Sequence, residues 1–266
     1  MSNTTSTEAV AGTEQAIREE LDRFVAGDSG RSVALEVLDG PAIRADVAGD
    51  ATRPAASLVK VLLAIALYRG AARGEFDLDA TVRRGDLGTT MYPSILEAFE
   101  EDRPLTLREV CAFSLLTSDN PAAEYLRELV GTDRATAVSR DLGLKQSTFD
   151  AGFGDDALAD NEANVTTARE ALQLFIHIER TPELADLRRF LINNLRNNRI
   201  PARLDDDVPV MHKTGSLETV CNDAGIIYAP QRRIALAYFC EEQSDTVLTS
   251  VDIADSALRI VEILTG

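Results

Sequence analysis

The spacing of hydrophobic and polar positions changes twice along this 266-residue chain. Residues 13–26 place Glu, Ala, Leu and Phe at helical intervals behind Thr13, a residue typical of a helix N-cap. Residues 32–37 and 42–47 alternate apolar and polar side chains around Asp39-Gly40-Pro41, which predicts a β-hairpin. The chain is therefore expected to begin with one helix and two strands.

The rest of the pattern is helical in the middle and extended near the end. Helices are predicted over residues 57–73, 106–116, 121–130, 132–142, 167–180 and 182–195. Strands are predicted over residues 208–213, 222–228 and 234–240, before a last amphipathic helix over residues 247–264. Strands from both chain ends would form one antiparallel sheet flanked by the terminal helices, with an all-helical lobe inserted, which is an α/β (α+β) fold.

This order predicts one domain, residues 13–266, after a flexible start of residues 1–12. Its α/β lobe would contain about residues 13–50 and 200–266, and its helical lobe about residues 51–199. A chain of this length can bury one large core. The cleft between two such lobes is a common place for a small-molecule site.

Composition narrows the class of partner. The chain has 44 acidic and 27 basic residues and a net charge of −17. Nucleic acids and anionic membranes need a basic surface, and no apolar run reaches the roughly 20 residues of a membrane span. The first residues lack the basic and apolar regions of a secretion signal, so a cytoplasmic location is expected unless a signal has been removed. A small-molecule substrate is the expected partner, and the oligomeric state stays open.

Lysine is rare and its positions are therefore informative. The chain has only Lys60, Lys145 and Lys213, and its other cationic side chains are arginines. A buried lysine amine can lose its proton near neutral pH, whereas arginine stays charged. Lys60 and Lys213 both fall inside motifs that carry chemistry, and Lys145 is interpreted as a surface residue.

The first motif is Ser57-Leu58-Val59-Lys60 at the start of a predicted helix. A spacing of three residues puts the hydroxyl and the amine on one face of the helix. The N–H groups at a helix start can stabilise an oxyanion and lower the pKa of the lysine, which then accepts the serine proton. The alternative is an N-cap serine beside a surface lysine, because this short pattern is common on its own.

The second motif is Ser118-Asp119-Asn120, directly before Pro121. A hydroxyl and an amide at this helix start can shuttle a proton and hold a substrate carbonyl. The alternative is ordinary capping by Ser118 or Asp119, with proline at a permitted first-turn position.

The third motif is Lys213-Thr214-Gly215 at the end of an apolar strand. The amine and the threonine hydroxyl would bind a carboxylate, and glycine would let a ligand lie close to the strand. The alternative is a strand that simply enters a turn.

Together and in this order, the three motifs resemble those of the class A β-lactamase-like serine hydrolases, in the β-lactamase and penicillin-binding protein superfamily. The resemblance covers most of residues 15–264. It includes residues 106–123, Tyr92-Pro93, Val165-Thr166-Thr167-Ala168 and residues 222–227.

The resemblance implies a β-lactamase/transpeptidase-like fold and an acyl-serine reaction without metal or cofactor. It implies that Ser57 attacks the carbonyl, Lys60 takes the proton, and Ser118 relays a proton to the leaving nitrogen. It further implies that the substrate is bound by Asn120, Lys213, Thr214, Gly215 and Tyr92, with the backbone N–H groups of Ser57 and Ser216 as the oxyanion hole.

The sequence departs from this family in one place. No Arg-x-Glu-x-x-x-Asn pattern is present, and counting back from Thr166 puts the deacylating glutamate near Phe153. The remaining acidic candidates are Asp150, Asp155, Asp160 and Glu162, which equally fit a solvated acidic loop. Without such a carboxylate, the acyl-enzyme is expected to persist, as in a penicillin-binding protein.

Three other functions stay open. One is a cytosolic amidase, peptidase or esterase, another is a penicillin-binding-type protein that acylates without turnover, and the third is a binding protein. A Ser-His-Asp triad is disfavoured because the only histidines are His177, inside a helical pattern, and His212, next to Lys213 on a strand. Neighbours on a strand point to opposite faces.

Overall fold

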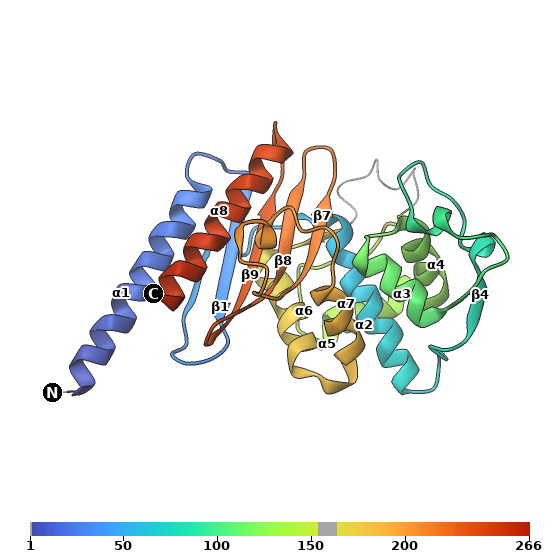
Figure 1. The fold of residues 1–266 in the computed structure, drawn as a ribbon, viewed down its shortest axis with the longest axis horizontal. Coiled ribbons are helices and arrows are strands. Elements are labelled where there is room, and N and C mark those ends of the chain that lie inside the picture. The colour runs from blue at the N-terminus through green and yellow to red at the C-terminus, as the bar shows by residue number, and fades with distance from the viewer. Residues whose placement is uncertain (1, 154–163) are drawn as a thin grey trace.

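The computed structural model describes residues 2–153 and 164–266, and it places one antiparallel sheet beside a helical lobe (Figure 1). The strand order is β2-β1-β9-β8-β7. These strands are β1 (Arg31–Val37), β2 (Arg44–Val47), β7 (Val210–Ser216), β8 (Cys221–Ala229) and β9 (Arg232–Cys240). The terminal helices α1 (Ser2–Val25) and α8 (Thr246–Thr265) lie side by side against one face of the sheet (Figure 1). The predicted α+β arrangement is confirmed.

Both faces of this sheet are buried. Along β9, Ala237 and Phe239 pack into the core shared with the helical lobe, whereas Leu236 and Tyr238 pack under the terminal helices. The β-hairpin predicted around Asp39-Gly40-Pro41 is confirmed, since β1 pairs with β2 in antiparallel register. β1 is buried along nearly its whole length because it lies between β2 and β9, with helices on both faces.

The helical lobe surrounds one apolar helix. Its helices are α2 (Val59–Ala72), α3 (Leu107–Leu116), α4 (Asn120–Val130), α5 (Thr132–Asp141), α6 (Ala168–Arg180) and α7 (Ala185–Ile192). α2 is buried almost all round, which its continuous apolar sequence requires. Two small sheets tie loops together: β3 (Arg53–Pro54) pairs with β6 (Val165–Thr166), and β4 (Thr81–Arg83) pairs with β5 (Pro104–Thr106). Strands of two or three residues are too short to show a period in the sequence.

Two predicted helices, residues 13–26 and 182–195, differ from the structure by more than two residues at an end. α1 begins at Ser2, so the helix predicted over residues 13–26 extends through residues 2–12, where each added residue gains a helical hydrogen bond. α7 ends at Ile192, three residues before the predicted end. There the amide of Asn194 donates to the carbonyl of His212, at 3.0 Å, and this contact draws the chain toward β7.

No helix in the described part of the chain has both the length and the apolar character needed to cross a bilayer.

Candidate active site

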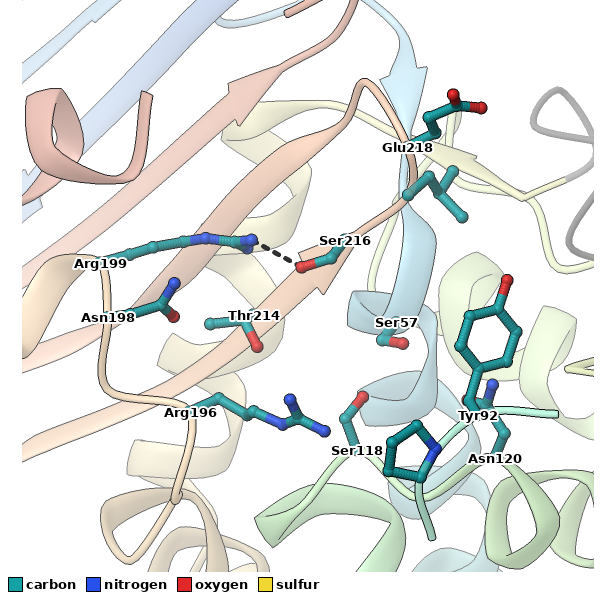
Figure 2. A pocket seen from close by; sticks show the side chains of 12 residues that line it. Ser57, Tyr92, Ser118, Asn120, Arg196, Asn198, Arg199, Thr214, Ser216 and Glu218 are labelled. Atoms are coloured by element: carbon teal, nitrogen blue, oxygen red, sulfur yellow. Dashed lines mark hydrogen bonds between the residues drawn. The ribbon is translucent and has the colours of Figure 1, made fainter. Parts of the chain in front are cut away.

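A cavity of about 800 Å³ lies between the end of β7 and the helical lobe (Figure 2). Its lining residues are Ser57, Tyr92, Pro93, Ser118, Asn120, Arg196, Asn198, Arg199, Thr214, Ser216, Leu217 and Glu218. The structure thus brings together six of the residues that the sequence predicts for the site. The other three, Lys60, Lys213 and Gly215, do not line the cavity, and both lysines are fully buried.

Ser57 is placed by a tight turn that leads into α2. It lies inside the 3₁₀ turn η1 (Ala56–Leu58), where the N–H of Leu58 donates to the carbonyl of Ala55 at 3.2 Å. Ala56 has a φ of +48°, a left-handed conformation that costs free energy for any residue with a Cβ. This strained turn presents Ser57 to the cavity (Figure 2). The alternative of an N-cap serine with a surface lysine is wrong, since Lys60 is buried.

The amine of Lys60 is held by the second motif. Its Nζ donates to the carbonyl of Ser118 and to Oδ1 of Asn120, each at 2.7 Å, and lies 3.4 Å from Oγ of Ser118. Burial lowers the pKa of Lys60 to about 7; the charge of Asp119 opposes this shift and that of Arg196 adds to it. Near neutral pH the amine of Lys60 is therefore uncharged in a large share of the protein molecules, and in that form it can accept a proton.

A phenyl ring covers this amine, close to the position that the sequence predicts for the missing glutamate. The ring centroid of Phe153 lies 4.9 Å from Nζ of Lys60, and the side chain is only 4% exposed. The backbone N–H of Phe153 donates to Oε2 of Glu124 at 2.7 Å, which fixes the position of the ring. A phenyl ring has no lone pair with which to activate water.

Of the four acidic candidates, the structure describes only Asp150. Its side chain is exposed and does not line the cavity, and its backbone N–H donates to Oδ1 of Asn164 at 2.9 Å. The other three, Asp155, Asp160 and Glu162, lie outside the described residues.

The second motif performs capping as well as lining the cavity. Asp119 is the N-cap of α4 and accepts from the N–H of Ala122 at 3.0 Å. The same carboxylate accepts from the N–H of Ile95 at 3.1 Å and from Oγ of Ser94 at 2.5 Å. The capping interpretation is therefore right for Asp119. Its neighbour Ser118, at a φ of +61°, lines the cavity instead.

We expect Asp119→Ala to lower the free energy of unfolding by about 2–3 kcal/mol, because it removes a helix cap and leaves buried donors without a partner. Denaturant unfolding followed by circular dichroism measures this loss. Asp133→Ala is the matched control, since Asp133 is an exposed residue in the first turn of α5. Equal stability of the two variants would contradict the anchoring role of Asp119.

In the third motif, close packing explains why residue 215 is a glycine. A Cβ on Gly215 would lie 2.8 Å from the carbonyl oxygen of Ala55 and 2.8 Å from Cδ1 of Leu58. Glycine therefore lets β7 approach the turn that carries Ser57, rather than letting a ligand approach the strand. Next to it, Nζ of Lys213 donates to the carbonyl of Thr214 at 2.8 Å, and burial together with nearby Lys60 holds the pKa of Lys213 well below its usual value.

The sequence predictions missed the wall formed by the loop after α7. Arg196, Asn198 and Arg199 line the cavity from this loop. Arg199 is buried and donates to Oγ of Ser216 at 2.6 Å and to the carbonyl of Gly215 at 2.8 Å. The available signal was the run of asparagines and arginines over residues 193–199, which is unusual between an apolar helix and an apolar strand.

Neither histidine lines the cavity. His212 is buried, with Nδ1 2.9 Å from Oδ1 of Asp223 and Nε2 3.0 Å from Oδ1 of Asn197. His177 contacts Arg69 and Thr181 at the end of α6. Within residues 2–153 and 164–266, no three His, Cys, Asp or Glu side chains are grouped to hold a metal ion.

The fold is similar to several solved structures of related enzymes. A β-lactamase from Chitinophaga pinensis DSM 2588 is 25% identical, with a TM-score of 0.85 over 94% of this chain and 99% of that chain. A class A β-lactamase from Bacteroides cellulosilyticus DSM 14838 is 22% identical, with a TM-score of 0.84 over 95% of this chain and 98% of that chain. A leucine-to-glutamate mutant of PBP-A, in an acyl-enzyme complex with penicillin G, is 20% identical, with a TM-score of 0.80 over 96% of each chain.

The sequence has no significant match among curated proteins. Its family, however, is shown directly, because the model of the β-lactamase enzyme family matches residues 15–262, nearly the whole chain. The chain therefore belongs to the β-lactamase enzyme family.

Proposed function

We propose that the protein acylates Ser57 with β-lactams or related amides and releases the acyl group slowly, in the manner of a penicillin-binding protein. One observation carries this proposal: the buried amine of Lys60 contacts Ser118 and Asn120 of the cavity wall, and the phenyl ring of Phe153 covers it close to where a carboxylate would activate water. Ser57, Ser118 and Asn120, the residues to which we assign acylation together with Lys60, line the cavity, and Glu218 is the one carboxylate among the described lining residues.

In the proposed reaction, Oγ of Ser57 attacks the carbonyl carbon while Nζ of Lys60 accepts its proton. The backbone N–H groups of Ser57 and Ser216 stabilise the oxyanion. Ser118 Oγ, 3.4 Å from Nζ of Lys60, passes a proton to the leaving nitrogen as the C–N bond breaks. Asn120 offers its amide N–H to the substrate, because its Oδ1 already accepts from Lys60.

Hydrolysis of the resulting ester needs a water molecule and a base. Glu218 is the one described carboxylate that lines the cavity, and Figure 2 shows its side chain pointing away from Ser57. The complex of the PBP-A mutant with penicillin G supports the proposal, since it shows that an enzyme of this fold can hold a penicillin-derived acyl group.

The test is to mix the protein with a chromogenic cephalosporin and to follow colour and protein mass together. We expect one equivalent of colour in a burst and a mass adduct on Ser57, both absent in Ser57→Ala. Sustained turnover would instead show an efficient β-lactamase and would contradict slow release of the acyl group. Ester hydrolysis with neither adduct nor turnover would favour an esterase or amidase and would contradict the proposal.

The burst rate should depend on pH through Lys60. The uncharged amine is the reactive form, so the rate should fall about tenfold per pH unit below the pKa of about 7 and level off above it. Stopped-flow absorbance between pH 5 and 9 measures this profile. A rate that is flat from pH 5 to 7 would show that Lys60 is not the base.

A further inference from the structure

The cavity wall after α7 is a segment without regular structure. Residues 193–199, all of them described, form neither helix nor strand and lie between α7 and the 3₁₀ turn η6 (Ile200–Arg203). Three of them, Arg196, Asn198 and Arg199, line one side of the cavity (Figure 2). A segment of this kind lacks a ladder of backbone hydrogen bonds, so other contacts must hold its side chains in place.

Three contacts, spaced three residues apart along this segment, hold it to the sheet. Nδ2 of Asn194 donates to the carbonyl of His212 at 3.0 Å. Oδ1 of Asn197 lies 3.0 Å from Nε2 of the same histidine. The N–H of Ile200 donates to Oδ2 of Asp223 at 3.1 Å. The residues that line the cavity fall between these anchors, and all three anchors end on His212 or Asp223.

His212 and Asp223 form one buried pair. Both side chains are shielded from water, and Nδ1 of His212 lies 2.9 and 3.1 Å from the two carboxylate oxygens of Asp223. A buried carboxylate needs such a donor, so the pair is expected to stay together. The bond at Nδ1 fixes the orientation of the imidazole ring and directs Nε2 at Asn197.

This pair lies on the face of the sheet that the terminal helices cover. Along β7, Val210 packs under the terminal helices and Met211 packs toward the helical lobe, so the next side chain, His212, points to the terminal helices again. Asp223 follows two residues after Cys221, which packs on that same face. Neither His212 nor Asp223 is among the described residues that line the cavity. Any effect of the pair on a substrate must therefore pass through the anchored segment.

We propose that His212 is a positioning residue, which together with Asp223 holds residues 196–199 in the conformation that binds substrate. The groups to which we assign acylation belong to other segments of the chain. Displacement of this wall should therefore weaken substrate binding and leave the covalent step unchanged. The inference rests on the proposed function only for that covalent step. Asn197 offers a direct test, because it is exposed and its side chain can be removed without opening the core.

The test separates affinity from rate. Calorimetry measures binding of a chromogenic cephalosporin to Ser57→Ala, and stopped-flow absorbance measures the limiting acylation rate with Ser57 intact. We expect Asn197→Ala to weaken binding about fivefold, the contribution of about one hydrogen bond, and to leave the limiting rate within about twofold. When His212→Phe has already removed the shared contact, Asn197→Ala should weaken binding by less than about twofold more. If His212→Phe does not fold, the single variant at Asn197 decides.

Asn193→Ala is the matched control. Asn193 is also an exposed asparagine of this segment, but its Nδ2 donates to the carbonyl of Arg189 in α7, at 2.7 Å. The inference is overturned if Asn197→Ala does not weaken binding, if the control weakens it equally, if the limiting acylation rate falls together with the affinity, or if the cephalosporin does not bind to Ser57→Ala. A missing adduct on Ser57 in the unaltered protein would instead refute the proposed function and leave the binding result valid.

Discussion

Lys60→Met is expected to slow acylation of Ser57 by about a thousandfold, which is within the range that a positioned general base contributes. Methionine fills a similar volume but cannot accept the serine proton. Lys60→Arg should be equally slow, since a guanidinium keeps its proton at working pH. Mass spectrometry of the adduct against time measures both rates.

The chain offers a matched control for these variants. Lys145→Met removes the one exposed lysine, and it should leave the acylation rate unchanged. An active Lys60→Arg variant would show that the positive charge matters more than proton transfer. That result would refute the assignment of Lys60 as the base.

Lys60→Met should also change stability in a pH-dependent way. Burial lowers the pKa of Lys60 in the folded protein, so the cost of keeping it buried is full below about pH 7 and disappears above the pKa of the unfolded chain. Thermal unfolding should therefore show a larger gain for Lys60→Met at pH 6 than at pH 9. This gain would show that the site retains a destabilising amine for its chemistry.

The sequence predicted the parts of this molecule that depend on local spacing. The sheet strands and long helices have strong periods, and Lys60 follows Ser57 at a helical interval that survives folding. In the structure Lys60 lies one turn after Ser57, with Nζ 2.7 Å from the carbonyl of Ser118, a contact that helical spacing alone did not predict. The relative position of Ser57 and Lys60 is set by the helix alone, so the sequence is sufficient to predict it.

Features that depend on contacts between distant segments were not predicted. Arg196 enters the cavity because Asn194 bonds to the strand carbonyl of His212, which ends α7 early. Gly215 is needed because β7 meets the turn at Ala55, a contact across 160 residues. Neither contact can be predicted from the spacing of residues along the chain.

Both the sequence and the folded structure point to Phe153, and the second prediction with a large expected effect concerns this residue. Counting along the sequence put the missing glutamate near this position, and folding puts the ring 4.9 Å from Nζ of Lys60. Phe153→Glu would therefore place a carboxylate beside Lys60, close to the acylated Ser57. We expect it to speed deacylation by about a hundredfold, the contribution of a general base to activation of water.

The same change should slow acylation, because a nearby negative charge favours the protonated form of Lys60 and raises its pKa. The pH at which the burst rate levels off should move upward accordingly. Loss of the buried ring should also lower the free energy of unfolding by about 3 kcal/mol. Decay of the mass adduct, burst kinetics and denaturant unfolding separate these three effects.

Phe153→Gln is the control, since it has the shape of the glutamate variant without its base. If the glutamine variant deacylates as fast as the glutamate variant, faster release comes from water entering the space left by the ring. If neither variant releases the acyl group faster than the unaltered protein, absence of a carboxylate at this position does not limit turnover. In that case slow release would have to arise from how the acyl group is held against Ser118 and Asn120, which lie on either side of the capping Asp119.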